Sequence, residues 1–240
     1  MGVLQQLEAE GLVRDTTAGG FVSPSGQSYV STGERSGVPG TRCYAIKRII
    51  CDERIARRAA DAGAELVEKA HVASATLGAD DRWQVRCQDG RVFRGRMLIA
   101  ADGANSRLAR ALGVVATPPQ AVASRQYIRG GTHNFKSGGV LLYPSYVLPG
   151  YVALFRHYND DLDVGAYVIP GGALRNDRLA RLYENELRHD PFLQRALGPR
   201  AEPLEPVRIA PIRLGGESCS TARQFMAVGD AAGQTDPLTG

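Results

Sequence analysis

The sequence lacks the features that mark several large classes of protein. Its 240 residues contain only four cysteines, and no C-x-x-C pair or matching histidine spacing is present, so we expect no zinc site and read the cysteines as reduced thiols. No apolar run approaches the roughly 18 residues of a membrane span. The opening residues, which include Glu8 and Glu10, lack the apolar core of a signal peptide. These absences predict a soluble, cytoplasmic protein.

Lysine is also scarce, and arginine supplies almost all of the 29 basic residues, which exceed the 25 acidic ones for a net charge of +4. The arginines are spread among strands and amphipathic stretches and are not clustered with aromatic residues. Nucleic-acid binding is therefore not predicted. The 43% content of hydrophobic residues predicts a buried core.

The chain alternates between helical and strand patterns. We expect a helix from Asp52, as its N-cap, to Gly63, followed by a meander over residues 68–93 with a hairpin turn at Asp89-Gly90. Residues 97–101 are continuously apolar, which is typical of a strand buried on both faces. The pattern continues with at least three strands over residues 140–168 and a mostly helical stretch over residues 174–197, with a break before Pro191.

The first motif with chemical content is RMLIAADGANSRLARALG, residues 96–113. An apolar strand that ends in Asp102-Gly103 places a carboxylate and a flexible turn at the carboxyl edge of a sheet, where open α/β folds bind ligands. Gly103 allows close approach of another molecule to the backbone. The alternative interpretation is an ordinary Asp-Gly turn.

The second motif is FMAVGDAAGQTDPLTG, residues 225–240. Its first four residues are apolar and predict a strand that ends at Asp230. The small residues after Asp230 leave room for a helix to begin beside a cofactor. The alternative is a strand-to-helix turn in which Asp230 is only an N-cap.

Together the motifs resemble the flavoprotein superfamily of the para-hydroxybenzoate hydroxylase type, and within it the geranylgeranyl reductase family of FAD-dependent oxidoreductases. Residues 43–66, CYAIKRIICDERIARRAADAGAEL, are similar to the family's Tyr-x-x-x-Arg-x-x-x-Asp segment. The resemblance implies FAD as cofactor and places Arg48 near the flavin, although an exposed arginine beside Lys47 is the other interpretation. The full set of flavin contacts that it implies is Arg48, Asp102, Gly103, Gly229, Asp230, Ala231, Pro237, Thr239 and Gly240.

The implied fold class is α/β, with a Rossmann-like FAD-binding domain of the glutathione reductase type interleaved with an antiparallel-sheet substrate domain. We assign residues 43–115 and 216–240 to the first, and residues 1–42 and 116–215 to the second. The superfamily's G-x-G-x-x-G turn does not occur in the chain. The resemblance thus implies an incomplete FAD domain and an internal fragment, which we expect to bind FAD weakly or not at all on its own.

A third segment, LPGYVALF, residues 148–155, resembles the family's Pro-Gly-Tyr-x-Trp-x-Phe-Pro stretch beside the substrate, with Ala153 in place of tryptophan. By that resemblance Tyr151 and Phe155 line a substrate cavity, whereas aromatic residues on a strand can equally serve a core. The apolar residues between Val140 and Val168 predict a sheet face that covers either a hydrophobic ligand or the helix that follows. No histidine is placed as a catalytic base, so the catalytic residues stay unknown.

The function that the resemblance implies is FAD-dependent reduction of double bonds in an isoprenoid or similar apolar substrate. Hydroxylation of an aromatic or polyketide substrate by an FAD-dependent monooxygenase is the alternative, and a catalytically silent truncated product is another. The implied partners are an apolar small molecule and an electron donor such as NAD(P)H or a ferredoxin, with peripheral membrane contact allowed for. We expect no metal and no nucleic acid.

Overall fold

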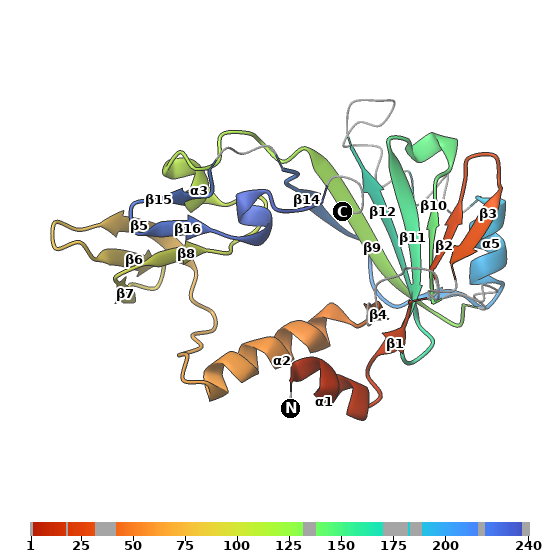
Figure 1. The fold of residues 1–240 in the computed structure, drawn as a ribbon, viewed down its shortest axis with the longest axis horizontal. Helices are drawn as coiled ribbons and strands as arrows, with labels where there is room; N and C mark the ends of the chain where they lie inside the picture. The colour runs from red at the N-terminus through yellow and green to blue at the C-terminus, as the bar shows by residue number, and fades with distance from the viewer. Residues whose placement is uncertain are drawn as a thin grey trace. The chain divides into compact units, whose positions relative to one another are not determined.

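The computed structural model divides the chain into two compact units, and each is described by itself (Figure 1). The structure describes residues 2–17, 19–31, 42–131, 138–169, 182, 189–215 and 219–236. The first unit comprises Met1–Ala64 and Val122–Ala210, and the second comprises Glu65–Ala121 and Pro211–Gly240. Residues 43–64 thus cluster with the large sheet, while the assignment of a function to each part stays a prediction.

The first unit is built on an eight-stranded sheet with the order β13-β9-β12-β11-β10-β2-β3, to which β14 is added by pairing with β9. The strands are β2 (Gly19–Val22), β3 (Ser28–Ser31), β9 (Ala121–Arg129), β10 (Gly139–Leu142), β11 (Gly150–Arg156), β12 (Leu162–Val168), β13 (Glu202–Pro203) and β14 (Arg208–Ile212). Along that order every pairing is antiparallel except that of β10 with β2. The three strands predicted between residues 140 and 168 are confirmed as β10, β11 and β12.

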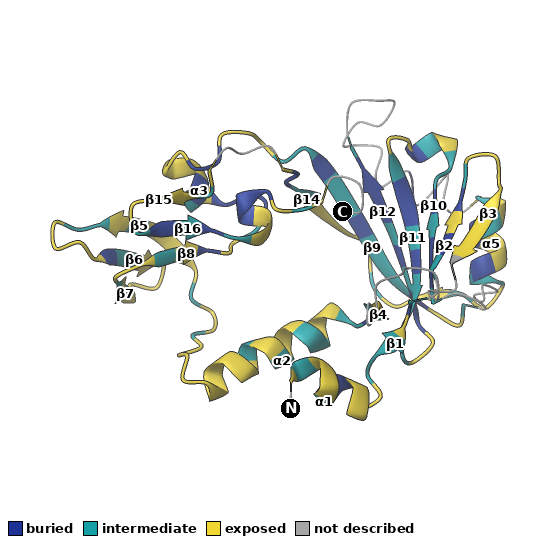
Figure 2. Cartoon of the chain, in the orientation of Figure 1, coloured by how far each residue is buried: buried dark blue, intermediate teal, exposed yellow. Residues whose placement is uncertain are grey.

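Alternation along these strands separates two faces of the sheet, because successive side chains point to opposite sides. One face is buried and forms the core of the unit, visible as dark segments in Figure 2. It packs against Leu193 and Ala196 of α5 (Pro191–Leu197), which Asp190 caps through hydrogen bonds from the Phe192 and Leu193 amides. The strand residues of this core include Val140, Leu142, Val152, Leu154, Val164, Ala166 and Val168. Most of the apolar residues that suggested a ligand face therefore serve the core.

The helices α1 (Val3–Ala9) and α2 (Arg48–Asp61), with β1 (Arg14–Asp15), β4 (Tyr44–Ala45) and the 3-10 turn η1 (Ser145–Val147), complete the described part of this unit. The expectation that Asp52 is the N-cap of a helix was wrong. α2 begins a turn earlier, after Lys47, and Asp52 lies inside it, where its carboxylate accepts a hydrogen bond from Arg48 at 2.9 Å. The i,i+4 ion pair of Arg48 with Asp52 stabilises a helix that begins upstream of Asp52.

The second unit contains two small sheets and the helix α3 (Arg107–Ala111). The predicted meander is confirmed as β5 (Val72–Leu77), β6 (Trp83–Cys87) and β7 (Val92–Gly95). The other sheet has the order β15-β16-β8, from β15 (Thr221–Ala222), β16 (Phe225–Ala227) and β8 (Leu98–Ala100).

The core of the second unit lies where Trp83 and Phe225 meet, with ring centroids 6.2 Å apart and the Trp83 indole donating to the Gln224 carbonyl at 2.8 Å. The expectation that residues 97–101 are buried on both faces was wrong, because Met97 and Ile99 are 55% and 56% exposed. Among the described residues, only the Ala100 side of β8 is covered by this core. No described helix is long and apolar enough to cross a membrane.

Candidate functional site: two aspartates at one sheet edge and an aromatic concavity

Asp102 and Asp230 follow two neighbouring strands of the second unit. β8 and β16 pair in parallel with Ala100 opposite Ala227, and the Val228 amide donates to the Ala100 carbonyl at 3.0 Å. Because the carboxyl ends of parallel neighbours meet at the same edge of a sheet, both aspartates reach that edge although 128 residues, 230 − 102, separate them in the chain. Both side chains are exposed there.

The backbone at this edge is open to another molecule. Gly103 has φ +82° and Gly229 has φ +60°, and a Cβ atom built on either would meet no other atom within 4 Å. A residue with a side chain would be strained at such φ values. Two exposed carboxylates next to two unobstructed glycines fit the demands of a dinucleotide, whose hydroxyl groups need acceptors and whose chain needs close approach to a backbone.

The segment after β16 forms a 3-10 turn, η3 (Gly229–Ala232), where an α-helix start was expected. Thr235 donates to one carboxylate oxygen of Asp230 at 2.8 Å, and the Gly229 amide donates to the Gln234 side chain at 2.8 Å. Ala231 is fully buried in the core, so only its backbone is available for the cofactor contact predicted from the sequence. The predicted contacts at Pro237, Thr239 and Gly240 lie outside the described residues.

Arg48 lies in the first unit, on the first turn of α2. Its side chain is 75% exposed, and the guanidinium makes a two-point contact with Asp52 at 2.9 and 3.1 Å. This arrangement fits both interpretations given above, because an exposed i,i+4 pair can exchange its carboxylate for a phosphate. A flavin contact by Arg48 stays a prediction.

Tyr151 and Phe155 line one concavity of about 180 Å³ on the sheet face opposite the core. They stand two positions on either side of Ala153 along β11, and the register places Ala153 opposite Gly165 of β12. The smallest side chains thus form the floor between two aromatic residues. The full lining is Ala123, Ser124, Arg125, Tyr151, Ala153, Phe155, Asp163, Gly165, Ala166 and Tyr167.

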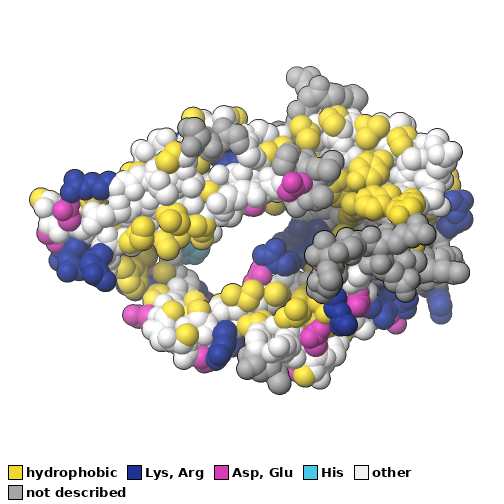
Figure 3. Space-filling model, viewed as in Figure 1, with side chains coloured by type: hydrophobic (Ala, Val, Ile, Leu, Met, Phe, Trp, Pro, Cys, Tyr) yellow, Lys and Arg dark blue, Asp and Glu magenta, His cyan; other side chains and the backbone are white. Residues whose placement is uncertain are grey.

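The aromatic side chains of this face contact one another. Tyr151 stacks on Tyr167 with ring centroids 5.1 Å apart, and Tyr143 lies 6.0 Å from Tyr151 on the other side. Tyr143 also borders a second concavity of about 490 Å³, whose lining includes Phe21 and Tyr29. Figure 3 shows hydrophobic side chains gathered where β10 and β11 lie. The two concavities adjoin at the Tyr143–Tyr151 contact and form a mainly apolar surface.

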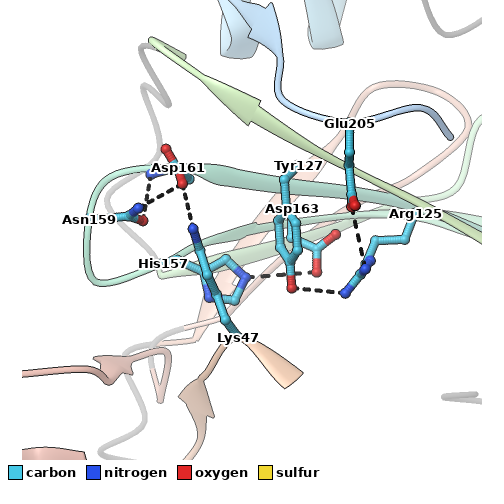
Figure 4. Close-up of polar contacts among 8 residues, drawn as sticks. All are labelled: Lys47, Arg125, Tyr127, His157, Asn159, Asp161, Asp163 and Glu205. Carbon is cyan, nitrogen blue, oxygen red and sulfur yellow. Dashed lines mark hydrogen bonds and ion pairs between the residues drawn. The ribbon is translucent and has the colours of Figure 1, made fainter. Parts of the chain in front are cut away.

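Polar side chains border the concavity at β9 and β12 (Figure 4). Arg125 donates to the Tyr127 hydroxyl at 2.9 Å and to Glu205 at 3.3 Å, and its guanidinium carbon lies 4.3 Å from the Tyr127 ring centre. Burial raises the pKa of the Tyr127 hydroxyl, and the charge of Asp163 adds to that rise. Tyr127 therefore stays a neutral hydroxyl at physiological pH.

Lys47, which precedes α2, and Asp161, which precedes β12, form a buried ion pair. Nζ lies 2.5 Å from Oδ2, and the side chains are only 15% and 6% exposed. Burial by itself raises the pKa of Asp161, but the hydrogen bonds from Lys47 and Asn159, with the charges of Lys47 and Arg129, lower it below the ordinary value. The pair attaches the start of α2 to the turn between β11 and β12.

The sequence reasoning missed Arg125, Asp163 and Tyr167. The signal was available in the alternation itself: these residues occupy the positions between the core residues Ser124, Val164 and Ala166, and so face the other side. The predicted ligand face was based on the apolar residues at alternate positions of these strands, and those residues form the core.

The chain resembles curated proteins along nearly its whole length, although no family model matches it. It is 39% identical to conditioned medium factor receptor 1 of Dictyostelium discoideum, over 100% of this chain and 49% of that protein. It is 32% identical to digeranylgeranylglycerophospholipid reductase 1 of Methanothermobacter thermautotrophicus, over 92% of this chain and 55% of that protein. The chain thus spans about half the length of these relatives.

Solved structures share the fold. A geranylgeranyl bacteriochlorophyll reductase-like protein from Thermoplasma acidophilum superposes with a TM-score of 0.78 at 18% identity, over 100% of this chain and 61% of that one. The flavin-dependent halogenase CmlS superposes with a TM-score of 0.75 at 21% identity, over 99% of this chain and 44% of that one. With the two aspartate motifs at one sheet edge and the reductases among its relatives, the chain resembles the geranylgeranyl reductase family of FAD-dependent oxidoreductases.

Proposed function

We propose that the chain is part of an FAD-dependent enzyme that reduces carbon–carbon double bonds of an isoprenoid or similarly apolar substrate. The observation that carries this proposal is the apolar concavity on the sheet face opposite the core. The second unit of the same chain brings two exposed aspartates to one sheet edge. The resemblance to the reductases and the names of these relatives support the proposal.

Asp102 and Asp230 would hold FAD through hydrogen bonds from its hydroxyl groups, with the backbone at Gly103 and Gly229 beside it. The fit rests on exposed acceptors and open glycine backbone. Bound FAD, once reduced, supplies the hydride in this chemistry. The residues of this edge supply orientation, and none of them needs to change its protonation state to do so.

The concavity would hold the substrate by excluding water from its apolar chain. Tyr151 and Phe155 provide aromatic walls, and Ala153 and Gly165 leave the floor open. A tryptophan at position 153 would occupy that space, so the alanine of this chain suits a bulky ligand. The second concavity, bordered by Phe21 and Tyr29, would extend the apolar surface for a longer chain.

FAD-dependent oxygenation of an aromatic substrate is the second candidate, and one observation favours it. The Tyr151–Tyr167 stack at 5.1 Å presents flat rings to the concavity, and a substrate ring can add to such a stack. A catalytically silent product is the third possibility that the sequence raised.

The test uses the protein encoded by the whole reading frame, supplied with FAD and with NADPH or reduced ferredoxin. Geranylgeraniol and a para-alkylphenol are the two substrates, and mass spectrometry identifies the product. A gain of two hydrogens on the isoprenoid is the expected result. A gain of one oxygen would replace the reductase assignment with the monooxygenase, and no turnover of either substrate in a flavin-loaded protein would favour the silent product.

A Tyr151→Ala variant sharpens this experiment, with Tyr44→Ala as its control. Both remove one tyrosine ring, but Tyr44 lines neither concavity, whereas Tyr151 lines the smaller one. We expect the first to lower kcat/KM for the isoprenoid by roughly tenfold or more, as the loss of a packed aromatic wall implies. Equal effects of the two substitutions would show that the substrate does not react in this concavity.

A further inference from the structure

Asp163 stands where the apolar concavity meets the polar border. The register of β12 places it beside Phe155 of β11 and Tyr127 of β9, and its side chain is part of the concavity lining. His157 follows β11 and lies next to the Asp163 side chain. Its Nε2 is 3.7 Å from Asp163 Oδ2, and the imidazole is 3% exposed. One carboxylate oxygen thus faces the histidine.

The polar atoms of these two residues are not satisfied. Among the residues that the structure describes, Oδ1 of Asp163 and both ring nitrogens of His157 are buried and have no hydrogen-bond partner. Such atoms are rare in folded proteins, and each costs about 1–3 kcal/mol when it stays unpaired. Oδ1 has no exposed surface, but the Asp163 side chain as a whole is 20% exposed, so a rotation of its carboxylate would bring Oδ1 to a donor on a ligand or a water molecule in the concavity.

We propose, on the basis of the function proposed above, that Asp163 accepts a hydrogen bond from a hydroxyl group at the polar end of the substrate. His157 acts as a positioning residue that orients the carboxylate. The ligand class is therefore an apolar alcohol, which an isoprenoid alcohol and a phenol both represent. Its apolar part lies over Ala153 and Gly165 toward β10.

The charges at the border favour a neutral hydroxyl over a charged group. Two cations at this border are already paired among the described residues, Arg125 with Glu205 and Lys47 with Asp161. An anionic group would meet the carboxylate of Asp163, whereas an ammonium group would meet the guanidinium of Arg125. A hydroxyl donor satisfies Asp163 without bringing a further charge into a partly buried site.

The test compares ligands that differ only in the hydroxyl group, using the 240-residue chain and isothermal titration calorimetry. One pair is geraniol and its hydrocarbon counterpart, in which hydrogen replaces the hydroxyl group. The other pair is para-propylphenol and propylbenzene. We expect at least one alcohol to bind roughly tenfold or more tightly than its partner, as a hydrogen bond to a charged acceptor implies, and the pair that shows the preference identifies the substrate type.

Asp163→Leu should reduce that ratio to about one while the hydrocarbon still binds. Asp163→Asn keeps the shape of the side chain and should lower the ratio of the two affinities by several fold. This variant provides the test if the leucine variant does not fold. Asp160→Asn is the matched control, because this carboxylate is 62% exposed in the turn before β12 and does not line the concavity; its ratio should equal that of the wild type.

Three results would overturn the proposal. A ratio near one in the wild type would mean that water satisfies Asp163, and the reductase proposal would survive because the hydrocarbon binds. A wild-type preference that persists in both Asp163 variants would place the hydroxyl elsewhere. Absence of binding for all four ligands would remove the concavity as an apolar site, and with it the proposed function.

Discussion

Replacing Asp161 by asparagine tests whether the Lys47–Asp161 pair stabilises the first unit. The substitution keeps the shape but leaves the ammonium of Lys47, only 15% exposed, without a carboxylate at 2.5 Å. Breaking a buried pair from one side costs about 3–5 kcal/mol. We expect the lower end, about 3 kcal/mol, because the new amide oxygen still accepts a hydrogen bond and the Tyr127 ring, 5.2 Å from Nζ, still faces the cation.

Hydrogen exchange of the β12 amides, followed by mass spectrometry, measures this loss in the first unit alone. A loss of about 3 kcal/mol accelerates exchange by roughly a hundredfold. The matched control is Glu53→Gln, the same carboxylate-to-amide change in the exposed Glu53–Arg57 pair, whose side chains are 55% and 70% exposed. It should change exchange by no more than about twofold. Equal effects of the two substitutions would refute the reasoning.

The pH dependence of the difference follows from the pKa of Asp161. Its folded-state pKa lies below the ordinary value of 3.8, so the pair contributes its full stability above that value and loses it as the pH falls through the folded pKa. The gap between wild type and Asp161→Asn should therefore be constant from about pH 7 to about pH 5 and shrink below about pH 4. A gap that closed near neutral pH would point to another group.

Three further outcomes follow from the structure. Ala153→Trp should fill the smaller concavity and weaken binding of geraniol by roughly tenfold with the near-ultraviolet circular dichroism unchanged, and an unaltered dissociation constant would place the ligand elsewhere. Asp102→Asn and Asp230→Asn should each lower the FAD affinity of the protein from the whole reading frame by roughly tenfold to a hundredfold, measured by flavin fluorescence; an effect of only one would contradict the shared edge. Ser106→Ala removes the hydroxyl that accepts the Ala109 amide at 3.1 Å and should cost about 1 kcal/mol in urea unfolding, whereas no loss would mean that water replaces the cap.

Local patterns in the sequence anticipated much of the secondary structure. The Asp89-Gly90 turn predicted the hairpin between β6 and β7, and Gly90 has the positive φ of +89° that such a turn needs. The two apolar strands ending in aspartate predicted that Asp102 and Asp230 share an edge, because strand ends are set by local residues and parallel strands align their ends. The N-cap signal at Asp52 was wrong, because the i,i+4 ion pair of Asp52 with Arg48 favours an earlier start of the helix.

The sequence by itself determined that strands over residues 140–168 have two faces, because alternation is a property of the extended backbone. Only the tertiary structure decided which face is core, since that depends on where α5 packs. It also brought Arg125, Tyr127, Asp163 and Glu205 to one border, through the pairing of β9 with β12 and a side-chain contact between Arg125 and Glu205, which are 80 residues apart in the chain. Pairing over such distances depends on the whole sheet, and no local pattern carries it.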